Sequence, residues 1–421
     1  MTVDIADGVR PELDGTALLE QIEVLAGIGV DHSRPEAGRT RLALSDQDRL
    51  ARDRLVSWMK ELELEVRVDP MGNIFGILAG EDASCSNALM IGSHIDTVIE
   101  AGPLDGAYGV LSGLAVARTI RLAGLRPRRT LMVGAFTNEE GVRFHPDMMG
   151  SLFFAGGIGL EEARAARGTD GAALGDELRR IGYAGDADPA ALRPAEYLEL
   201  HVEQGPVLDS EGIDIGVVED LQGISWKRIV IEGTANHAGT TPISMRHDAG
   251  FAAARGIVFL RELARDSGGT RTTVGTVFFS PGAINVIPSR AEFTVDMRDP
   301  DEDRLSRGEK GFMDFLDRLE AEEGVNVSVE TLARFQPVRF DRGLADAIEA
   351  VAKGRGLSTL RMTSGAGHDA QMLARVCRTA MIFVPSREGV SHNPAEFTPS
   401  EQLVQGAKVL LDVALQRLGR S

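Results

Sequence analysis

The stretch FTNEEGVRF places two carboxylates, Glu139 and Glu140, side by side directly after the apolar run LMVGAF. Neighbouring residues on a strand point in opposite directions, so a single structural role rarely needs both side chains. A solvated loop with an acidic helix start would account for an average pair of glutamates. Whether this pair does chemistry depends on the polar residues that follow the other apolar runs.

The other apolar runs also end in side chains that can bind a metal ion. They are His94 and Asp96 in ALMIGSHID, Asp105 in GPLDG, His201, Glu203 and Gln204 in EYLELHVEQG, and His392 in MIFVPSREGVSHN. A lone histidine at a strand end is usually a hydrogen-bonded histidine, and an aspartate beside a glycine is common in turns. Ligands of an open α/β sheet, however, bind at the carboxyl ends of its strands. Together these residues therefore predict a metal centre at one sheet edge.

The donor set consists of imidazole nitrogens and carboxylate oxygens without a thiolate, which suits zinc, manganese, cobalt or nickel. The donors outnumber the ligands of one tetrahedral ion. The sequence therefore predicts two divalent ions with a bridging carboxylate. The two oxygens of Asp105 can span ions that lie roughly 3.5–4 Å apart.

Short, nearly continuous apolar runs supply the strands that would position these residues. The runs cover 88–92, 130–136, 196–202 and 379–384, and helical periodicity marks 15–27, 45–63 and 110–123. The segment LEVRVDPMGNIFGILAG adds a predicted hairpin. Buried strands separated by helices are typical of an α/β sheet covered on both faces. We therefore expect a mostly parallel catalytic sheet.

Residues 220–333 have a different pattern, which indicates a second, α+β domain. The predicted strands are SWKRIVIEGT, TTVGTVFF, AEFTVDMR and VNVSVETL, and the predicted helices cover 247–265 and 302–323. This β-α-β-β-α-β order is that of the ferredoxin-like split unit. We therefore predict a catalytic domain of residues 1–219 and 334–421, interrupted by a ferredoxin-like domain of residues 220–333.

Length, charge and cysteine content restrict the class of protein further. A chain of 421 residues exceeds one ordinary core, and its net charge of −18 argues against nucleic acid or an anionic membrane as a partner. No apolar run is long enough to predict a membrane span, and the start MTVDIADGVR does not resemble a secretory signal. The two cysteines, Cys85 and Cys377, predict no disulfide framework, so we expect a cytoplasmic protein.

Eight motifs, in the same order, resemble the hydantoinase/carbamoylase amidases of the M20 metallopeptidase clan. They are GSHIDTV, GPLDGAYGV, NEEGVRF, HVEQGP, ANHAGTTP, NVIPSRAEFTVDMR, SGAGHDA and SHNPAEFT. This family includes N-carbamoyl-L-amino-acid amidohydrolases, allantoate amidohydrolases and β-ureidopropionases. One departure is Ala101, where the family often has a glycine before GPLDG. That change could alter the shape of the loop, but it touches no ligand.

The resemblance implies a role for each residue of the predicted metal centre and a dimetal exopeptidase-like fold. One ion would be held by His94 and His201, the other by Glu140 and His392, with Asp105 bridging. Asp96 would orient His94 from outside the ligand set. Glu139 would be the general base, which takes a proton from water polarised by the ions and returns it to the leaving nitrogen.

The substrate implied is a small anion, an N-carbamoyl-L-amino acid or a related ureido acid. On so acidic a chain its carboxylate needs a dedicated cation, and Arg298 in DMR can grip it with two parallel hydrogen bonds. A strand-end salt bridge is the alternative for Arg298. The resemblance adds Gln204, Asn285 and Gly367 to the pocket. His368 is either a wall of the site or a packing residue.

The resemblance also implies a homodimer. His237 in ANHAGTTP would supply a donor to the developing oxyanion, and in the family this histidine reaches the active site of the other subunit. Two alternatives stay open: an N-acyl-amino-acid deacylase, dipeptidase or aminopeptidase of the same clan, and a non-catalytic scaffold. The intact ligand set argues against a scaffold. His32, His145, His247 and the cysteines receive no role.

Overall fold

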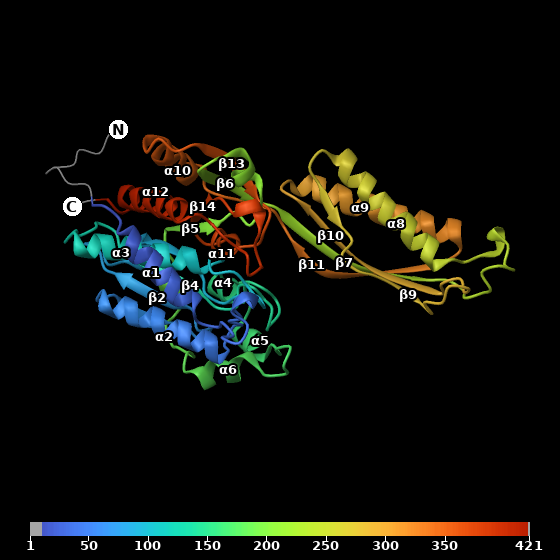
Figure 1. The fold of residues 1–421 in the computed structure, drawn as a ribbon, viewed down its shortest axis with the longest axis horizontal. Coiled ribbons are helices and arrows are strands. Elements are labelled where there is room, and N and C mark those ends of the chain that lie inside the picture. The colour runs from blue at the N-terminus through green and yellow to red at the C-terminus, as the bar shows by residue number, and fades with distance from the viewer. Residues whose placement is uncertain (1–10, 420–421) are drawn as a thin grey trace. The chain divides into compact units, whose positions relative to one another are not determined.

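The computed structural model describes residues 11–419, which fold as two compact units. The first unit contains the chain up to Glu219 and again from Arg339, and the second contains Asp220–Val338. Figure 1 shows a helix-covered sheet in the first unit and a sheet with two long helices in the second. The second unit is therefore an insertion into the first.

The first unit is built on a nine-stranded sheet whose centre is parallel. The central order is β4 (Leu131–Phe136), β3 (Leu89–His94), β5 (Glu196–Val202) and β14 (Arg378–Val384). The antiparallel strands β2 (Ile74–Leu78) and β1 (Glu65–Val68) extend one edge. The other edge consists of β6 (Ile215–Leu221), β12 (Val338–Arg339) and β13 (Thr359–Ser364). This is the mixed α/β sheet with a mostly parallel centre that the apolar runs predict.

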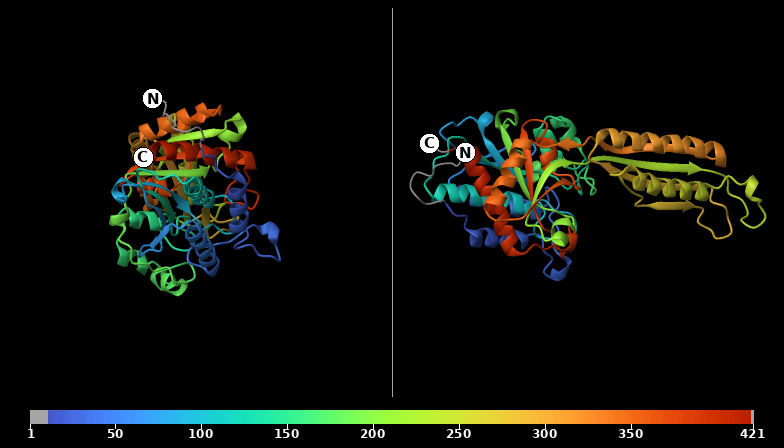
Figure 2. Two further views of the ribbon diagram at one scale, coloured as in Figure 1. Left: turned by 90° about the vertical axis from the view of Figure 1, so that its left-hand side faces the viewer. Right: turned by 90° about the horizontal axis from the view of Figure 1, so that it is seen from above.

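Every residue of β3, β4 and β5 is buried, as expected for strands that are covered on both faces. One layer contains α1 (Gly15–Ala26), α3 (Ala107–Leu122), α10 (Arg342–Gly354) and α12 (Ser400–Leu418). Helix α11 (Asp369–Leu373) also packs against the sheet, and it contacts α4 (Met149–Phe154). Figure 2 gives two further views of these helices and strands.

The remaining helices of the first unit lie nearer its periphery. They are α2 (Asp46–Glu61), α5 (Leu160–Ala165), α6 (Leu174–Ile181) and α7 (Val207–Glu211). Side-chain caps mark several helix starts: Asp14 accepts a hydrogen bond at the start of α1, Ser45 at α2 and Asp341 at α10. Such caps satisfy amide groups that have no partner within the helix.

The second unit has an antiparallel sheet in the order β11–β7–β10–β8, with β9 also paired to β10. Its elements in chain order are β7 (Gly223–Glu232), α8 (Ala249–Ser267), β8 (Arg271–Thr273), β9 (Val277–Ser280), β10 (Arg290–Asp299), α9 (Glu302–Glu323) and β11 (Asn326–Phe335). Helices α8 and α9 pack against each other and against the sheet, and they share one apolar core with it.

The structure departs from the predicted elements in several places. The segment TTVGTVFF forms two strands, β8 and β9, because the chain leaves the ladder at residues 274–276, where the Thr276 amide donates to the Thr294 hydroxyl. β11 continues to Phe335, beyond the predicted domain boundary at residue 333. The edge strands β6, β12 and β13 were not predicted.

Candidate metal centre

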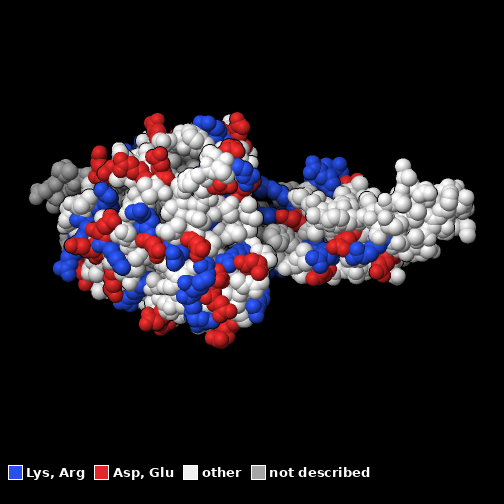
Figure 3. Space-filling view, turned by 60° about the horizontal axis from the view of Figure 1, so that its bottom comes forward, with Lys and Arg blue, Asp and Glu red and all other residues white. Residues whose placement is uncertain are grey.

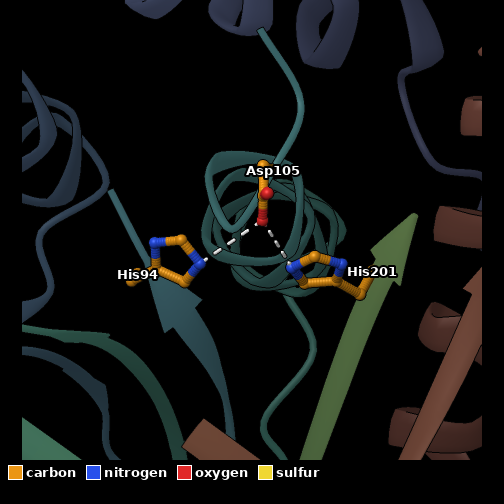
Figure 4. Close-up of side chains that lie close together, drawn as sticks. All are labelled: His94, Asp105 and His201. Carbon is orange, nitrogen blue, oxygen red and sulfur yellow. Dashed lines mark ion pairs between the residues drawn. The ribbon is translucent and has the colours of Figure 1, made fainter. Parts of the chain in front are cut away.

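Two strand ends and one helix start bring three of the predicted donors together. His94 is the last residue of β3, His201 lies near the end of β5, and Asp105 lies two residues before the start of α3. Figure 4 shows both imidazole rings directed at the Asp105 carboxylate. These three residues form one cluster of potential ligands among the described residues. Asp105, Glu140 and His392 form a second, and Glu199, His201 and His368 form a third.

The two carboxylate oxygens of Asp105 face different groups. Its Oδ1 lies 3.6 Å from Nε2 of His94 and 3.2 Å from Nε2 of His201. Its Oδ2 lies 3.1 Å from Nε2 of His392, which is itself 3.4 Å from Oε2 of Glu140. One aspartate therefore stands between two donor pairs.

Backbone carbonyl groups orient the two buried histidines. Nδ1 of His94 donates to the Asp96 carbonyl oxygen at 3.0 Å, and Nδ1 of His201 donates to that of Val202 at 2.8 Å. Each bond holds one ring nitrogen in place and turns Nε2 of the same ring toward Asp105.

The side chain of Asp96 acts differently from the expectation that it orients His94. Its carboxylate lies 3.9 Å from Nδ1 of His94, and its two oxygens accept hydrogen bonds from the backbone amides of Glu139 and Glu140, both at 3.3 Å. The backbone of Asp96 therefore holds the histidine, whereas its side chain holds the peptide that carries both glutamates.

The two neighbouring glutamates face different histidines. Oε2 of Glu139 lies 3.5 Å from Nε2 of His94, and Glu140 faces His392. Burial raises the pKa of Glu139 well above its ordinary value. Burial and the nearby Asp105 charge raise the pKa of Glu140 to about 8. A buried carboxyl with a raised pKa is suited to proton transfer near neutral pH.

The histidines and Asp105 stabilise each other's charged forms. Burial alone would raise the pKa of Asp105, but hydrogen bonds with His201, His392 and His94 hold it well below its usual range. The hydrogen bond with Asp105 raises the pKa of the half-exposed His392 to about 9.

Gly106 allows the close approach of His94 to Asp105. Its φ of +62° lies in a region that L side chains rarely adopt, and a Cβ there would lie 2.3 Å from Nε2 of His94. The glycine after Asp105 is therefore required by the packing of the donors.

The donor set fits a divalent metal ion. It consists of imidazole nitrogens and carboxylate oxygens, which bind zinc and similar ions. Oε1 of Glu140 is buried and has no hydrogen-bond partner among the described residues, as expected for an atom that a cation would satisfy.

Three predicted substrate residues lie in the first unit near these donors. Nε2 of Gln204 donates to Oδ2 of Asp105 at 2.8 Å. The His368 ring is buried, lies 4.6 Å from the His201 ring and hydrogen-bonds to the Ser364 hydroxyl at 3.0 Å. Gly367 directly precedes His368 in the chain.

The other predicted substrate residues belong to the second unit. A β-bridge joins His237 to Val286, so that exposed His237 and Asn285 lie on adjacent segments. Nη2 of Arg298 pairs with Asp296 at 2.9 Å, which is the strand-end ion pair named above as its alternative role. This pair fixes one edge of the guanidinium group.

The histidines without an assigned role are exposed and belong to none of the three ligand clusters; they are His32, His145 and His247. Sequence reasoning missed Glu396, a buried carboxylate that hydrogen-bonds to the Asp105 loop. Its only signal is an acidic residue within SHNPAEFT.

The sheet is mostly parallel, and its carboxyl edge brings histidines and carboxylates together around one aspartate. This fold and donor set fit an α/β protein that binds a divalent metal ion. The chain belongs to peptidase family M20/M25/M40, whose sequence profile matches residues 90–416. It is 38% identical over 98% of both chains to an N-carbamoyl-L-amino-acid amidohydrolase of Rhizobium meliloti. It is 34% identical, over 94% of this chain and 96% of the relative, to an allantoate amidohydrolase of Bacillus subtilis.

Solved structures agree with these relatives. A hydantoinase/carbamoylase family amidase from Burkholderia multivorans superposes with a TM-score of 0.91 at 39% identity and covers 97% of this chain and 98% of its own. Within residues 11–419, every helix is too short or too polar to cross a membrane.

Proposed function

We propose that this protein is a metal-dependent amidohydrolase that cleaves the carbamoyl (ureido) C–N bond of an N-carbamoyl-L-amino acid or a related ureido acid. The observation that carries this proposal is the two-sided contact of Asp105, with His94 and His201 at one oxygen and His392 at the other. It supports two divalent ions of zinc, manganese, cobalt or nickel, bridged by Asp105. The unpaired cysteines support a cytoplasmic setting.

In this proposal Glu139 moves the proton. When bound, the cations supply Lewis-acid polarisation of the carbonyl group and lower the pKa of water. Glu139 accepts a proton from the attacking water and delivers it to the leaving nitrogen. Its buried carboxyl, with a pKa well above the ordinary value, suits both steps. Glu140 serves as a ligand.

Arg298 recognises the carboxylate of the substrate in this proposal. Its contact with Asp296 holds the guanidinium plane in place, and a planar fork matches a carboxylate better than a lysine ammonium does. Gln204, Asn285 and Gly367 complete the pocket, and His237 donates to the developing oxyanion.

We propose further that two copies associate through the second unit, an inserted dimerisation domain of about residues 220–333, and that His237 of one copy serves the metal centre of the other. The second unit exposes large apolar side chains: Ile243, Met245, Phe278, Phe279 and Ile284. Figure 3 shows the right-hand end of this unit almost free of Lys, Arg, Asp and Glu. Exposed apolar surface of this kind supports an interface between proteins.

A deacylase or dipeptidase of the same family is the second candidate, because it would use the same donors. One experiment separates the candidates. The purified protein is assayed for amine release from N-carbamoyl, N-formyl and N-acetyl amino acids and from dipeptides, before and after chelator dialysis. We expect preference for the carbamoyl substrates, loss of turnover on dialysis and recovery with a divalent ion. Full turnover by protein shown to be metal-free would refute the proposal.

A further inference from the structure

Glu396 connects two loops that carry potential metal ligands. The residue is only 4% exposed. Its Oε2 accepts hydrogen bonds from the backbone amides of Leu104, at 2.7 Å, and Asp105, at 3.3 Å. Its Oε1 accepts one from the Ser391 hydroxyl at 3.1 Å. Because Ser391 directly precedes His392, one carboxylate joins the Asp105 loop to the His392 loop.

The Asp105 loop is held on its other side by backbone pairing. The Ala101 amide donates to the Arg39 carbonyl at 2.7 Å, and the Arg39 amide donates to the Ala101 carbonyl at 3.1 Å. This pairing uses only backbone atoms, which explains how alanine is accommodated at position 101. The loop between Ala101 and Asp105 is thus clamped between Arg39 and Glu396.

Gly102 provides the space that Glu396 occupies. A Cβ at this position would lie 2.2 Å from Cβ of Glu396 and 2.4 Å from its Oε2. Such distances are far below van der Waals contact, so any side chain at Gly102 would displace the carboxylate. Gly102 is not at positive φ, so its need for glycine comes from Glu396 and not from backbone strain.

Through Ser391, Glu396 is also connected to Oδ2 of Asp105, the oxygen that faces His392. The Ser391 hydroxyl, which donates to Glu396, also lies 3.4 Å from Oδ2 of Asp105. Loss of the Glu396 carboxylate would leave buried amide groups without an acceptor and would release both loops. Partners that hold metal ligands from outside typically contribute 10–100-fold to metal affinity.

We propose that Glu396 is a positioning residue, which fixes the Asp105 loop against the His392 loop so that both side chains bind the same cation. The inference rests on the proposed function, in which Asp105 bridges two ions. Glu396 is not a member of any of the three ligand clusters, and both of its oxygens accept hydrogen bonds from the two loops.

The test measures metal affinity directly. Glu396→Gln keeps the size of the side chain but removes its charge and replaces one acceptor oxygen with a donor. In competition with a chromophoric chelator, we expect the weaker of two Zn²⁺ equivalents to dissociate about 10–100-fold more readily. Glu401→Gln is the matched control, because Glu401 is an exposed glutamate in the first turn of α12. It should bind Zn²⁺ like the wild type.

A second variant keeps the inference testable if Glu396→Gln does not fold. Gly102→Ala leaves the Glu396 side chain chemically intact but pushes it away from Leu104, and it should reproduce the loss of the weaker equivalent. Wild-type affinity and stoichiometry in the folded variants would overturn the inference and leave the proposed function standing. A wild-type protein that binds no Zn²⁺ would instead contradict the proposed function itself.

Discussion

At the scale of single residues, Glu139 and Glu140 differ by the histidine that each one faces. Oε2 of Glu139 lies 3.5 Å from Nε2 of His94, and that of Glu140 lies 3.4 Å from Nε2 of His392. The Asp96 carboxylate accepts from both backbone amides and thereby fixes the peptide between them. Adjacent residues can therefore have separate functions, one in proton transfer and one in metal binding.

Because of this difference, we expect the variants Glu139→Gln and Glu140→Gln to lose different properties. Glu139→Gln should retain its metal content and lose roughly 10²–10⁴-fold in kcat, the usual contribution of a general base. Glu140→Gln should lose affinity for one metal equivalent, because an amide is a weaker ligand than a carboxylate. Elemental analysis and kinetics of both variants check this expectation. Equal loss of metal from both would show that the roles are wrongly assigned.

The sequence predicts the donors of the site but not all of the contacts that hold them. Four donors follow apolar runs or glycine motifs, namely His94, Asp105, Glu140 and His201. The strand pattern therefore predicts that they lie at one edge of the sheet. Glu396 belongs to a loop without periodicity. Because it is far from Leu104 in the sequence, the pattern does not predict their hydrogen bond. Only the folded chain brings them together.

At the scale of elements, the start of α3 determines how closely Asp105 approaches the histidines. Gly106 precedes the helix with φ of +62° and ψ of −51°, and Ala107 begins it. Periodicity predicted this helix only from residue 110, whereas it begins at Ala107. Likewise, the gap between β8 and β9 has no breaker other than Gly275, which a strand can tolerate.

Gly106→Ala should therefore weaken metal binding at the His94–His201 pair. The new Cβ would lie 2.3–2.4 Å from atoms of the His94 ring, far inside van der Waals contact, so the ring or the helix start must move. Gly124→Ala is the matched control, because Gly124 has a similar φ of +64° near the other end of α3 and no atom within 4 Å of a Cβ. Alanine at positive φ carries a backbone cost of about 1–3 kcal/mol in both variants, and Gly106, with its ψ of −51°, lies outside the left-handed region that other residues can adopt.

Zn²⁺ titration and thermal unfolding of these two variants separate the effects. We expect both variants to unfold at a lower temperature, with the larger decrease for Gly106→Ala because of its overlap with His94, and loss of a Zn²⁺ equivalent in Gly106→Ala alone. Equal Zn²⁺ binding by both alanine variants would mean that Gly106 serves only the backbone conformation of the helix start.

At the scale of the whole molecule, the proposed catalytic groups are divided between two units. Glu139 and the metal donors lie in the first unit, and His237, Asn285 and Arg298 lie in the second. The alternation of strands and helices predicts both units, because each has its own periodic pattern and its own core. The pattern does not reveal which copy of His237 serves which metal centre, because that depends on assembly.

Complementation between inactive chains tests this assembly. When Glu139→Gln and His237→Ala chains exchange subunits, a mixed dimer has one site with an intact Glu139 and a His237 from the partner. Random exchange should restore roughly a quarter of wild-type activity, since half of the dimers are mixed and each has one intact site. If His237 served its own chain, no mixed dimer would contain an intact site.

Glu139→Gln mixed with Glu140→Gln is the control, because both changes lie in the same unit and a mixed dimer gains no intact site. Absence of activity in the first mixture, with subunit exchange demonstrated by mass-tagged chains, would contradict the contribution of His237 across the dimer.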